Sequence, residues 1–267
     1  MQKTKKLFSL GLLALCLSLG LHFPVQAADY TNDMKIPGAA KITVNEGAAS
    51  IDRQLDHQPD PYFAHPDFYH MKGKGSLLLL PHFQTLQQSS EWSCGPAAAL
   101  MVLNWYGKRD GWSEQKLADL RHSCKDLKVN GFPEGYPGTT LAQMEDIFQK
   151  VGGFKTISST DYARKGKTFG PEDIKRFLQQ GRPIMVCWID WGGHWQDIIG
   201  YDDMGTENPQ DDVVIMADPY DTTDHNQDGY GIYPAARFFA LFDMFGSFPE
   251  SEGGNHNLFL VAYPDGQ

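Results

Sequence analysis

Cys94 lies where a polar, turn-prone run changes into an apolar one, and a cysteine in that position is a candidate nucleophile. Pro96 suits the first turn of a helix and residues 97–106 are almost all apolar, so we predict a buried helix that begins at Cys94. The positive end of its dipole favours thiolate over thiol, and the thiolate is the nucleophilic form. Six residues upstream, Gln88 carries an amide that a turn would bring beside the sulfur as an oxyanion donor. Alternatively, Cys94 is a small core residue, because free cysteine is often buried.

A base and an acid follow later in the chain. His194 comes after two glycines and begins a strand-like run, residues 194–201. Asp218 ends the next strand-like run, residues 212–217. Neighbouring strands would put the carboxylate beside the imidazole, where it fixes the tautomer and stabilises the imidazolium. The order of glutamine, cysteine, histidine and aspartate is that of a cysteine nucleophile with its base and orienting acid.

These residues resemble those of a known family. The segments Gln88 with Cys94-Gly95, His194-Trp195 and Asp218-Pro219 are similar to papain-like cysteine peptidases of the bacteriocin-processing, or double-glycine, type in a stand-alone exported form. The resemblance covers about residues 83–263. It implies that Cys94 is the nucleophile, His194 the general base and acid, Asp218 the orienting group, and Gln88 with the Cys94 N–H the oxyanion hole. It also implies a peptide or protein substrate and no required cofactor.

Two features depart from that family, and other functions stay open beside it. The best-known members are fused to a transporter and act on the cytoplasmic side, whereas this chain carries a signal-like segment. Residues 202–211 also lengthen the connection from histidine to aspartate, so specificity for a double glycine is not implied. The alternatives are a cell-wall amidase or transglutaminase-like acyltransferase, or an inactive binding module on the same fold.

The elements that would position these residues predict an α+β fold. We expect helices from Cys94 to residue 106, after Ser113, at 141–151 with a capping box from Thr140 and Gln143, at 172–180, and at 238–245. Strands are expected at 76–80, 184–189, 194–201, 212–217 and 258–263. Helices precede strands and the connections are mostly short, so we predict a papain-like arrangement with the nucleophile helix packed on a mostly antiparallel sheet.

The chain divides into three predicted parts. Residues 1–27 combine basic and apolar stretches with a small residue at the end, which predicts a signal peptide and export to the periplasm or the medium. Residues 28–75 are an extended arm or a removable pro-segment, and 76–267 form the peptidase domain. The formal charge of -10 argues against nucleic acid as a partner. No later segment is long and apolar enough to span a membrane, and the sequence leaves the oligomeric state open.

Two further features of the sequence are its cysteines and a candidate calcium loop. Cys94, Cys124 and Cys187 follow the signal, so either Cys124 pairs with Cys187 or none of the three is paired. Asp224, Asn226 and Asp228, followed by Gly229, match the start of a calcium loop, and a structural calcium there would stiffen the chain after Asp218. The glutamate expected at the twelfth position is replaced by Ala235, and aspartate-rich turns also occur without metal.

Overall fold

The computed structural model describes residues 66–90, 92–122, 138–221 and 228–267. The predicted signal peptide, most of the predicted arm and Cys124 lie outside these ranges. In chain order the elements are β1 (Leu77–Leu79), α1 (Cys94–Trp105), α2 (Glu114–Asp119), α3 (Leu141–Val151), β2 (Phe154–Ser158), α4 (Ser159–Arg164), α5 (Pro171–Gln179), β3 (Ile184–Trp188), η2 (Asp190–Gly192), β4 (His194–Asp202), β5 (Val213–Ala217), β6 (Tyr230–Pro234), α6 (Ala235–Leu241), η3 (Glu250–Glu252) and β7 (Leu258–Pro264).

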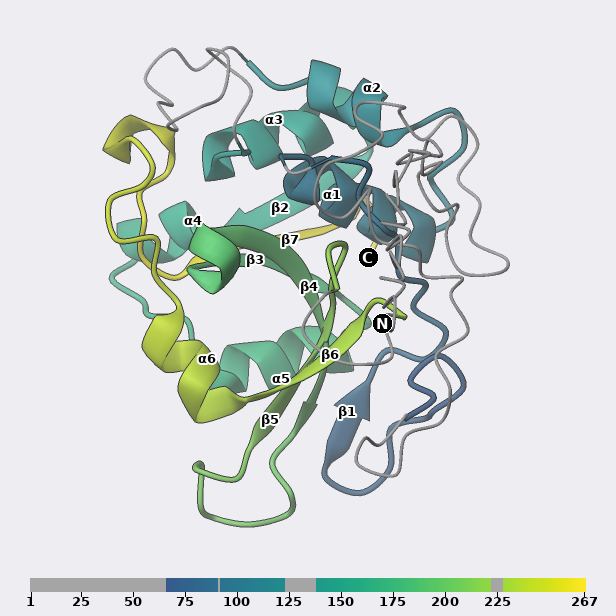
Figure 1. Ribbon diagram of the computed structural model, residues 1–267, viewed down its shortest axis with the longest axis vertical. Helices are drawn as coiled ribbons and strands as arrows, with labels where there is room; N and C mark the ends of the chain where they lie inside the picture. The colour runs from purple at the N-terminus through teal and green to yellow at the C-terminus, as the bar shows by residue number, and fades with distance from the viewer. Residues whose placement is uncertain (1–65, 91, 123–137, 222–227) are drawn as a thin grey trace, which may run out of the picture.

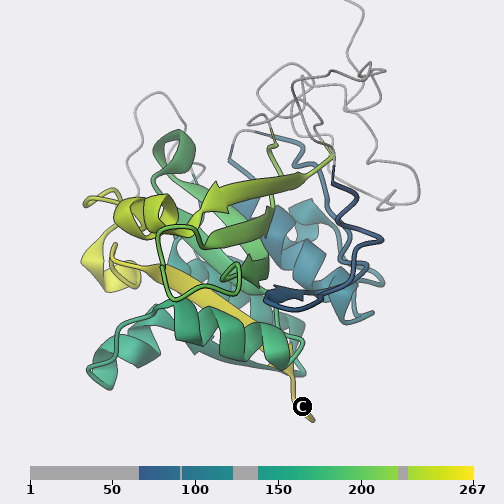
Figure 2. The ribbon, with the colours of Figure 1, turned by 90° about the horizontal axis from the view of Figure 1, so that it is seen from below.

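A single sheet organises the domain. Its strands run in the order β2-β7-β3-β4-β5-β6, and all the pairings are antiparallel. β1 pairs with the C-terminal end of β4, also antiparallel. The sheet is strongly twisted, as the two views show (Figures 1 and 2). β3, β4 and β5 carry almost only buried residues, so the sheet runs through the centre of the core.

Helices cover both faces of the sheet. α1 packs on β4 and α3 packs on β2 and β7, and these helices lie together on one side in Figure 1, with α5 and α6 on the other. Aromatic rings pack α5 and α6 against the strands. Trp188 of β3 contacts Phe238 of α6 at 5.3 Å between centroids, and Phe259 of β7 contacts Phe177 of α5 at 6.5 Å. The predicted α+β architecture is thereby confirmed. No helix of the described ranges is both long and apolar enough to cross a membrane.

Several elements differ from the sequence prediction. The helix expected at 238–245 is wrong in position, because α6 begins at Ala235 and ends at Leu241. Asp243 then forms a bridge with His256, and Phe245 takes a left-handed φ of 48°, which a helix excludes. β2, α4 and β6 were not predicted; β2 and β6 lack the continuous buried apolar run that marks β3. Cys187 is a buried free thiol, so it does not pair with Cys124.

Candidate active site

Cys94 is the first residue of α1 and is buried, with 5% of its surface exposed. The helix starts here because Pro96 fits its first turn, and the apolar residues that follow are buried on every side. Gly95 permits the close approach of a neighbouring segment: a Cβ there would lie 2.7 Å from both Cβ and Oγ1 of Thr139. The sulfur is therefore held at the N-terminal end of a fully packed helix.

His194 is the first residue of β4 and pairs with Trp188 at the end of β3. Its side chain is 5% exposed, and its Nε2 lies 2.6 Å from Oδ1 of Asp218. The imidazole also hydrogen-bonds the side chain of Cys94. Since Nε2 faces the carboxylate, Nδ1 is the ring nitrogen left to face the sulfur. The imidazole thus lies between the thiol and the carboxylate.

Asp218 follows β5 and is completely buried. Its Oδ1 accepts the backbone N–H of Tyr220 at 2.7 Å, and its Oδ2 accepts the side-chain amide of Gln196 at 2.8 Å. Burial by itself raises the pKa of this carboxyl, but the His194 imidazolium and these hydrogen bonds outweigh burial, and the pKa lies at about 2. The carboxylate is therefore ionised across the physiological range.

The charge of His194 follows from the same pair. Burial disfavours the imidazolium, but the facing Asp218 carboxylate outweighs it and raises the pKa of His194 to about 10, with a smaller contribution from Cys94. A protonated imidazole beside a cysteine is the arrangement that stabilises a thiolate.

Gln88 lies in the turn before α1 and is buried. Its Nε2 donates to the carbonyl of Ser90 at 2.6 Å, which uses one of the two N–H bonds of the amide. Its backbone N–H donates to the carbonyl of Pro219 at 2.8 Å. The turn that carries Gln88 is therefore fixed to the residue that follows Asp218.

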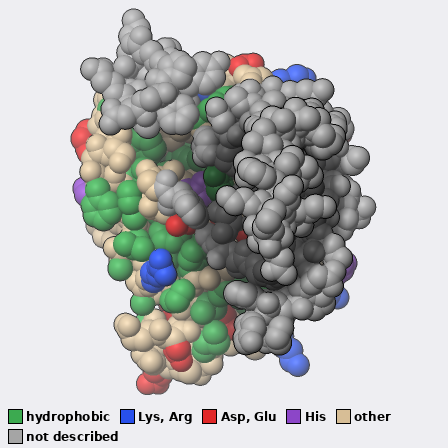
Figure 3. Space-filling view, viewed as in Figure 1, with side chains coloured by type: hydrophobic (Ala, Val, Ile, Leu, Met, Phe, Trp, Pro, Cys, Tyr) green, Lys and Arg blue, Asp and Glu red, His purple; other side chains and the backbone are tan. Residues whose placement is uncertain are grey.

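The chain after α6 forms one wall beside His194. A Cβ on Gly193, whose φ is 123°, would lie 2.3 Å from Cε of Met244, so this wall touches the residue before the histidine. Met244 also receives the thiol of Cys187 at 3.7 Å. Hydrophobic side chains gather over α6 and the chain that follows it, on the left of the face in Figure 3. Phe245, which follows Met244 in the sequence, is 68% exposed.

Three buried polar residues on β4 and α2 were not predicted. Gln196 orients Asp218 and also accepts the indole N–H of Trp188 at 2.6 Å. Period-two alternation from His194 would have placed it on the same face of β4. Asp197 has neither carboxylate oxygen hydrogen-bonded within the described structure, and burial raises its pKa well above the usual range. Glu114 is fully buried, although its place in the first turn of α2 is typical of an exposed residue.

The predicted calcium site is only partly within the structure, because Asp224 and Asn226 lie outside the described residues. Asp228 accepts the backbone N–H of Tyr230 at 3.0 Å, and its carbonyl accepts the hydroxyl of Thr85 at 2.7 Å. Among described residues, no cluster of three or more histidine, cysteine or acidic side chains forms a metal site.

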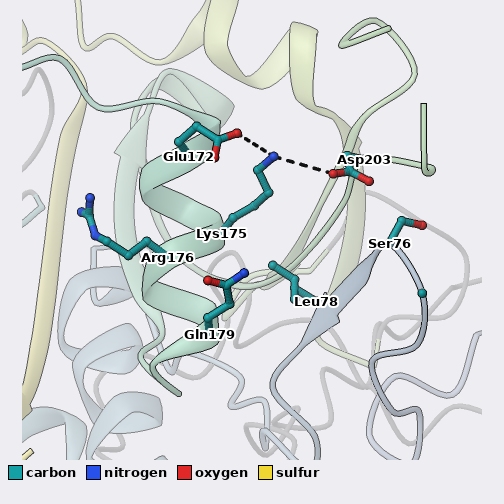
Figure 4. A pocket seen from close by; sticks show the side chains of 8 residues that line it. Ser76, Leu78, Glu172, Lys175, Arg176, Gln179 and Asp203 are labelled. Carbon is teal, nitrogen blue, oxygen red and sulfur yellow. Dashed lines mark ion pairs between the residues drawn. The ribbon is translucent and has the colours of Figure 1, made fainter. Parts of the chain in front are cut away.

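A polar groove of about 380 Å³ lies between α5 and β1 (Figure 4). Lys175 crosses it and pairs with Glu172 at 2.6 Å and with Asp203 at 3.6 Å. Asp203 follows the last residue of β4, whereas His194 is its first. The strand rises about 3.3 Å per residue, so roughly 25 Å separate its ends and the groove is distinct from the candidate active site.

Comparison with known proteins identifies the chain through its family. No curated protein matches the sequence. The model of the Peptidase_C39 like family matches residues 81–247, a range that includes Gln88, Cys94, His194 and Asp218. That family is one of cysteine peptidase type, acts on peptides, and has the papain-like α+β fold described above. The chain belongs to the Peptidase_C39 like family.

Proposed function

We propose that this protein is an exported cysteine peptidase in which Cys94 is the nucleophile, His194 the general base and acid, and Asp218 the orienting group. The observation that carries this proposal is the imidazole of His194, which lies 2.6 Å from Asp218 and hydrogen-bonds Cys94. The side-chain amide of Gln88 and the backbone N–H of Cys94 form the oxyanion hole. The four residues fall within the segment matched by the family.

The reaction proceeds in two halves. The Cys94 thiolate attacks the carbonyl carbon of a peptide bond, a C–S bond forms, and the electron pair of the carbonyl moves to oxygen, where Gln88 and the Cys94 N–H stabilise it. The intermediate collapses, the C–N bond breaks, and His194 protonates the departing amine. Neutral His194 then takes a proton from water, the hydroxide attacks the thioester, and the thiolate of Cys94 leaves from the carboxylic acid product.

The test is hydrolysis of an unstructured protein by the mature enzyme and by Cys94→Ala. Loss of cleavage in the variant, with an unchanged melting temperature, supports the proposal, and retained cleavage overturns it. Cys187→Ala is the matched control, because it removes the other buried free thiol of the described residues and should leave cleavage in place. Digestion of peptidoglycan by the wild-type enzyme, without cleavage of protein, would instead identify a cell-wall amidase.

We further propose that residues 1–27 direct export, and that the segment Asp224 to Asp228 binds one calcium ion with a structural role. The alternating oxygen ligands followed by Gly229 support the calcium site. Asp221 lies just before this segment, and its carboxylate accepts the N–H of Gly229 just after it at 2.5 Å. An ion in the loop would therefore stiffen the connection between Asp218 and β6 and would take no part in the chemistry.

A further inference from the structure

Glu114, on α2, is a fully buried acid that the proposed mechanism does not use. Its carboxylate accepts the backbone N–H of Ser89 at 3.1 and 3.2 Å, one distance to each oxygen, and it hydrogen-bonds the hydroxyl of Ser93. The Ser93 hydroxyl in turn accepts the N–H of Ser90 at 3.2 Å and its hydroxyl at 2.8 Å. One carboxylate thus anchors a compact polar turn inside the protein.

The two contacts of Glu114 fall at the two ends of this turn. Ser89 directly follows Gln88, which carries the side-chain donor of the oxyanion hole. Ser93 directly precedes Cys94, which carries the nucleophile and the backbone donor. Because both contacts converge on one side chain, the separation of the two donors depends on it.

We propose that Glu114 is a positioning residue for the peptidase reaction: its ionised carboxylate holds both ends of the turn from Gln88 to Cys94 and thereby sets the geometry of the oxyanion hole. This inference rests on the proposed function. A carboxylate suits this task because it is an acceptor only, and both of its partners are donors. A glutamine in its place would direct an NH₂ group at one of those donors.

The ionisation of Glu114 is sensitive to pH near neutrality. Burial raises the pKa of Glu114 to about 7, and the hydrogen bonds from Ser93 and Ser89 oppose that rise. Below this pH the carboxyl gains a proton and loses acceptor capacity. Both oxygens are therefore free to accept above pH 7, and the hydrogen bonding to the turn weakens as the pH falls through that value, although ionising this buried acid itself costs the folded state stability.

Charged neighbours do not complicate this titration within the described structure. No charged side chain contributes to the pKa of Glu114 among the residues described. On and after α2, the charged side chains have other partners: Lys116 donates to the carbonyl of Gly111, Asp119 accepts from Gln115, and Arg121 donates to the carbonyl of Gly138 and to Thr139. His122, which follows α2, pairs with Asp146 and Glu252 and has a raised pKa, so the part of a change near pH 7 that Glu114→Gln removes is the part that reports on the turn.

The first experiment compares the kinetics of wild type and Glu114→Gln on a peptide cleaved by the wild type. Losing one oxyanion donor costs about 10²–10³ in kcat, so displacing the donors is expected to lower kcat roughly tenfold with KM unchanged. Asp119→Asn is the matched control, since it removes an exposed acid from the same helix and should change neither constant. An unchanged kcat in a folded Glu114→Gln enzyme overturns the proposal.

A double-mutant cycle separates positioning from general stability. In a Gln88→Ala background the side-chain donor is already gone, so Glu114→Gln is expected to lower kcat by a much smaller factor than in the wild type. An equal factor in both backgrounds would mean that Glu114 acts on the fold alone, and this outcome contradicts the proposal.

A third measurement needs no substrate and therefore distinguishes failure of this inference from failure of the proposed function. The alkylation rate of Cys94 by iodoacetamide, followed by peptide mapping, is expected to show an inflection near pH 7 that Glu114→Gln removes. Ser93→Ala loses a hydrogen bond that lowers the pKa of Glu114, so it should move the inflection to higher pH. This milder variant also serves if Glu114→Gln does not fold. Profiles that superimpose in all the folded variants overturn the inference, whether or not peptides are cleaved.

Discussion

The backbone N–H of Gln88 donates to the carbonyl of Pro219 at 2.8 Å, so the turn before the nucleophile is joined to the residue after the orienting acid. The two residues are 131 positions apart, and the bond connects the start of α1 with the end of β5. The bond holds the two segments beside each other. The segments that carry the nucleophile and the orienting acid are therefore connected, and substitutions in each of them test the same site.

Replacing Asp218 by Asn should lower both activity and the pKa of His194. The carboxylate raises this pKa to about 10, so its removal should move the alkaline limb of the kcat/KM profile to lower pH. Poorer proton transfer should also reduce kcat by about 10²–10⁴-fold. Profiles against pH for the variant and for Asp211→Asn, an exposed loop control, test this prediction. An alkaline limb that stays in place would contradict it.

Replacing Gln196 by Leu should destabilise the protein and weaken the orientation of Asp218. The variant removes one hydrogen bond from Asp218 and one from the indole of Trp188, at a cost of about 1–3 kcal/mol. In the wild type this hydrogen bond lowers the pKa of Asp218. Without it the pKa of Asp218 rises, so acid unfolding of the variant should begin at a higher pH than that of the wild type. Acid titrations followed by circular dichroism measure this shift. Gln210→Leu, on an exposed loop, is the control and should leave the midpoint unchanged.

Replacing Gly193 by Ala should impair both folding and activity. The new Cβ would lie 2.3 Å from Cε of Met244, and the φ of 123° is strained for any residue with a side chain, at about 1–3 kcal/mol. Gly192→Ala separates the two effects, because its φ of 83° is also unfavourable but no atom lies within 4 Å of the added Cβ. The prediction is a larger loss of melting temperature for Gly193→Ala than for Gly192→Ala. Equal losses would show that the contact with Met244 is unimportant.

Replacing Asp197 by Asn should stabilise the protein at neutral and alkaline pH. Burial raises the pKa of this carboxyl in the folded state, so the folded protein retains a proton that the unfolded chain releases. Stability therefore falls as the pH rises above the ordinary aspartate pKa, and an amide removes this dependence. The expected gain is on the order of 1–3 kcal/mol at pH 8, measured by urea unfolding. Asp265→Asn, at an exposed position, should retain the wild-type slope of stability against pH.

Calcium should raise the melting temperature if the proposed loop binds it. An ion at a hundred times its dissociation constant stabilises the folded state by about 2.7 kcal/mol. The double variant Asp224→Asn with Asp228→Asn should lose this response while peptide cleavage continues at saturating substrate. The same melting temperature in calcium and in chelator would exclude the site.

The sequence predicts the elements that carry the candidate chemistry because each has a strong local signal. Pro96 and the apolar run after it mark the start of α1, and the run rich in isoleucine and aromatic residues after two glycines marks β4. The convergence of Cys94, His194 and Asp218 in space was an inference from neighbouring strands, since no local pattern encodes it.

Other features depend on long-range packing that the sequence alone does not reveal. Glu114 occupies a position typical of an exposed helix start, yet it is buried beside a turn that supplies hydrogen-bond donors to its carboxylate. β2 was missed because its pairing partner, β7, lies about a hundred residues later. The course of the chain after Leu241 follows from contacts with His256 and Gly193, which lie outside any local window.

The strand order makes the sheet depend on a strand that is synthesised late. β7 occupies the position between β2 and β3, so the strand nearest the end of this sequence is inserted into the middle of the sheet. A polypeptide that stops short of Leu258 leaves the edges of β2 and β3 without their neighbour, and β3 is the strand that supports His194. Synthesis of the chain must therefore pass β7 before the sheet that positions His194 is complete.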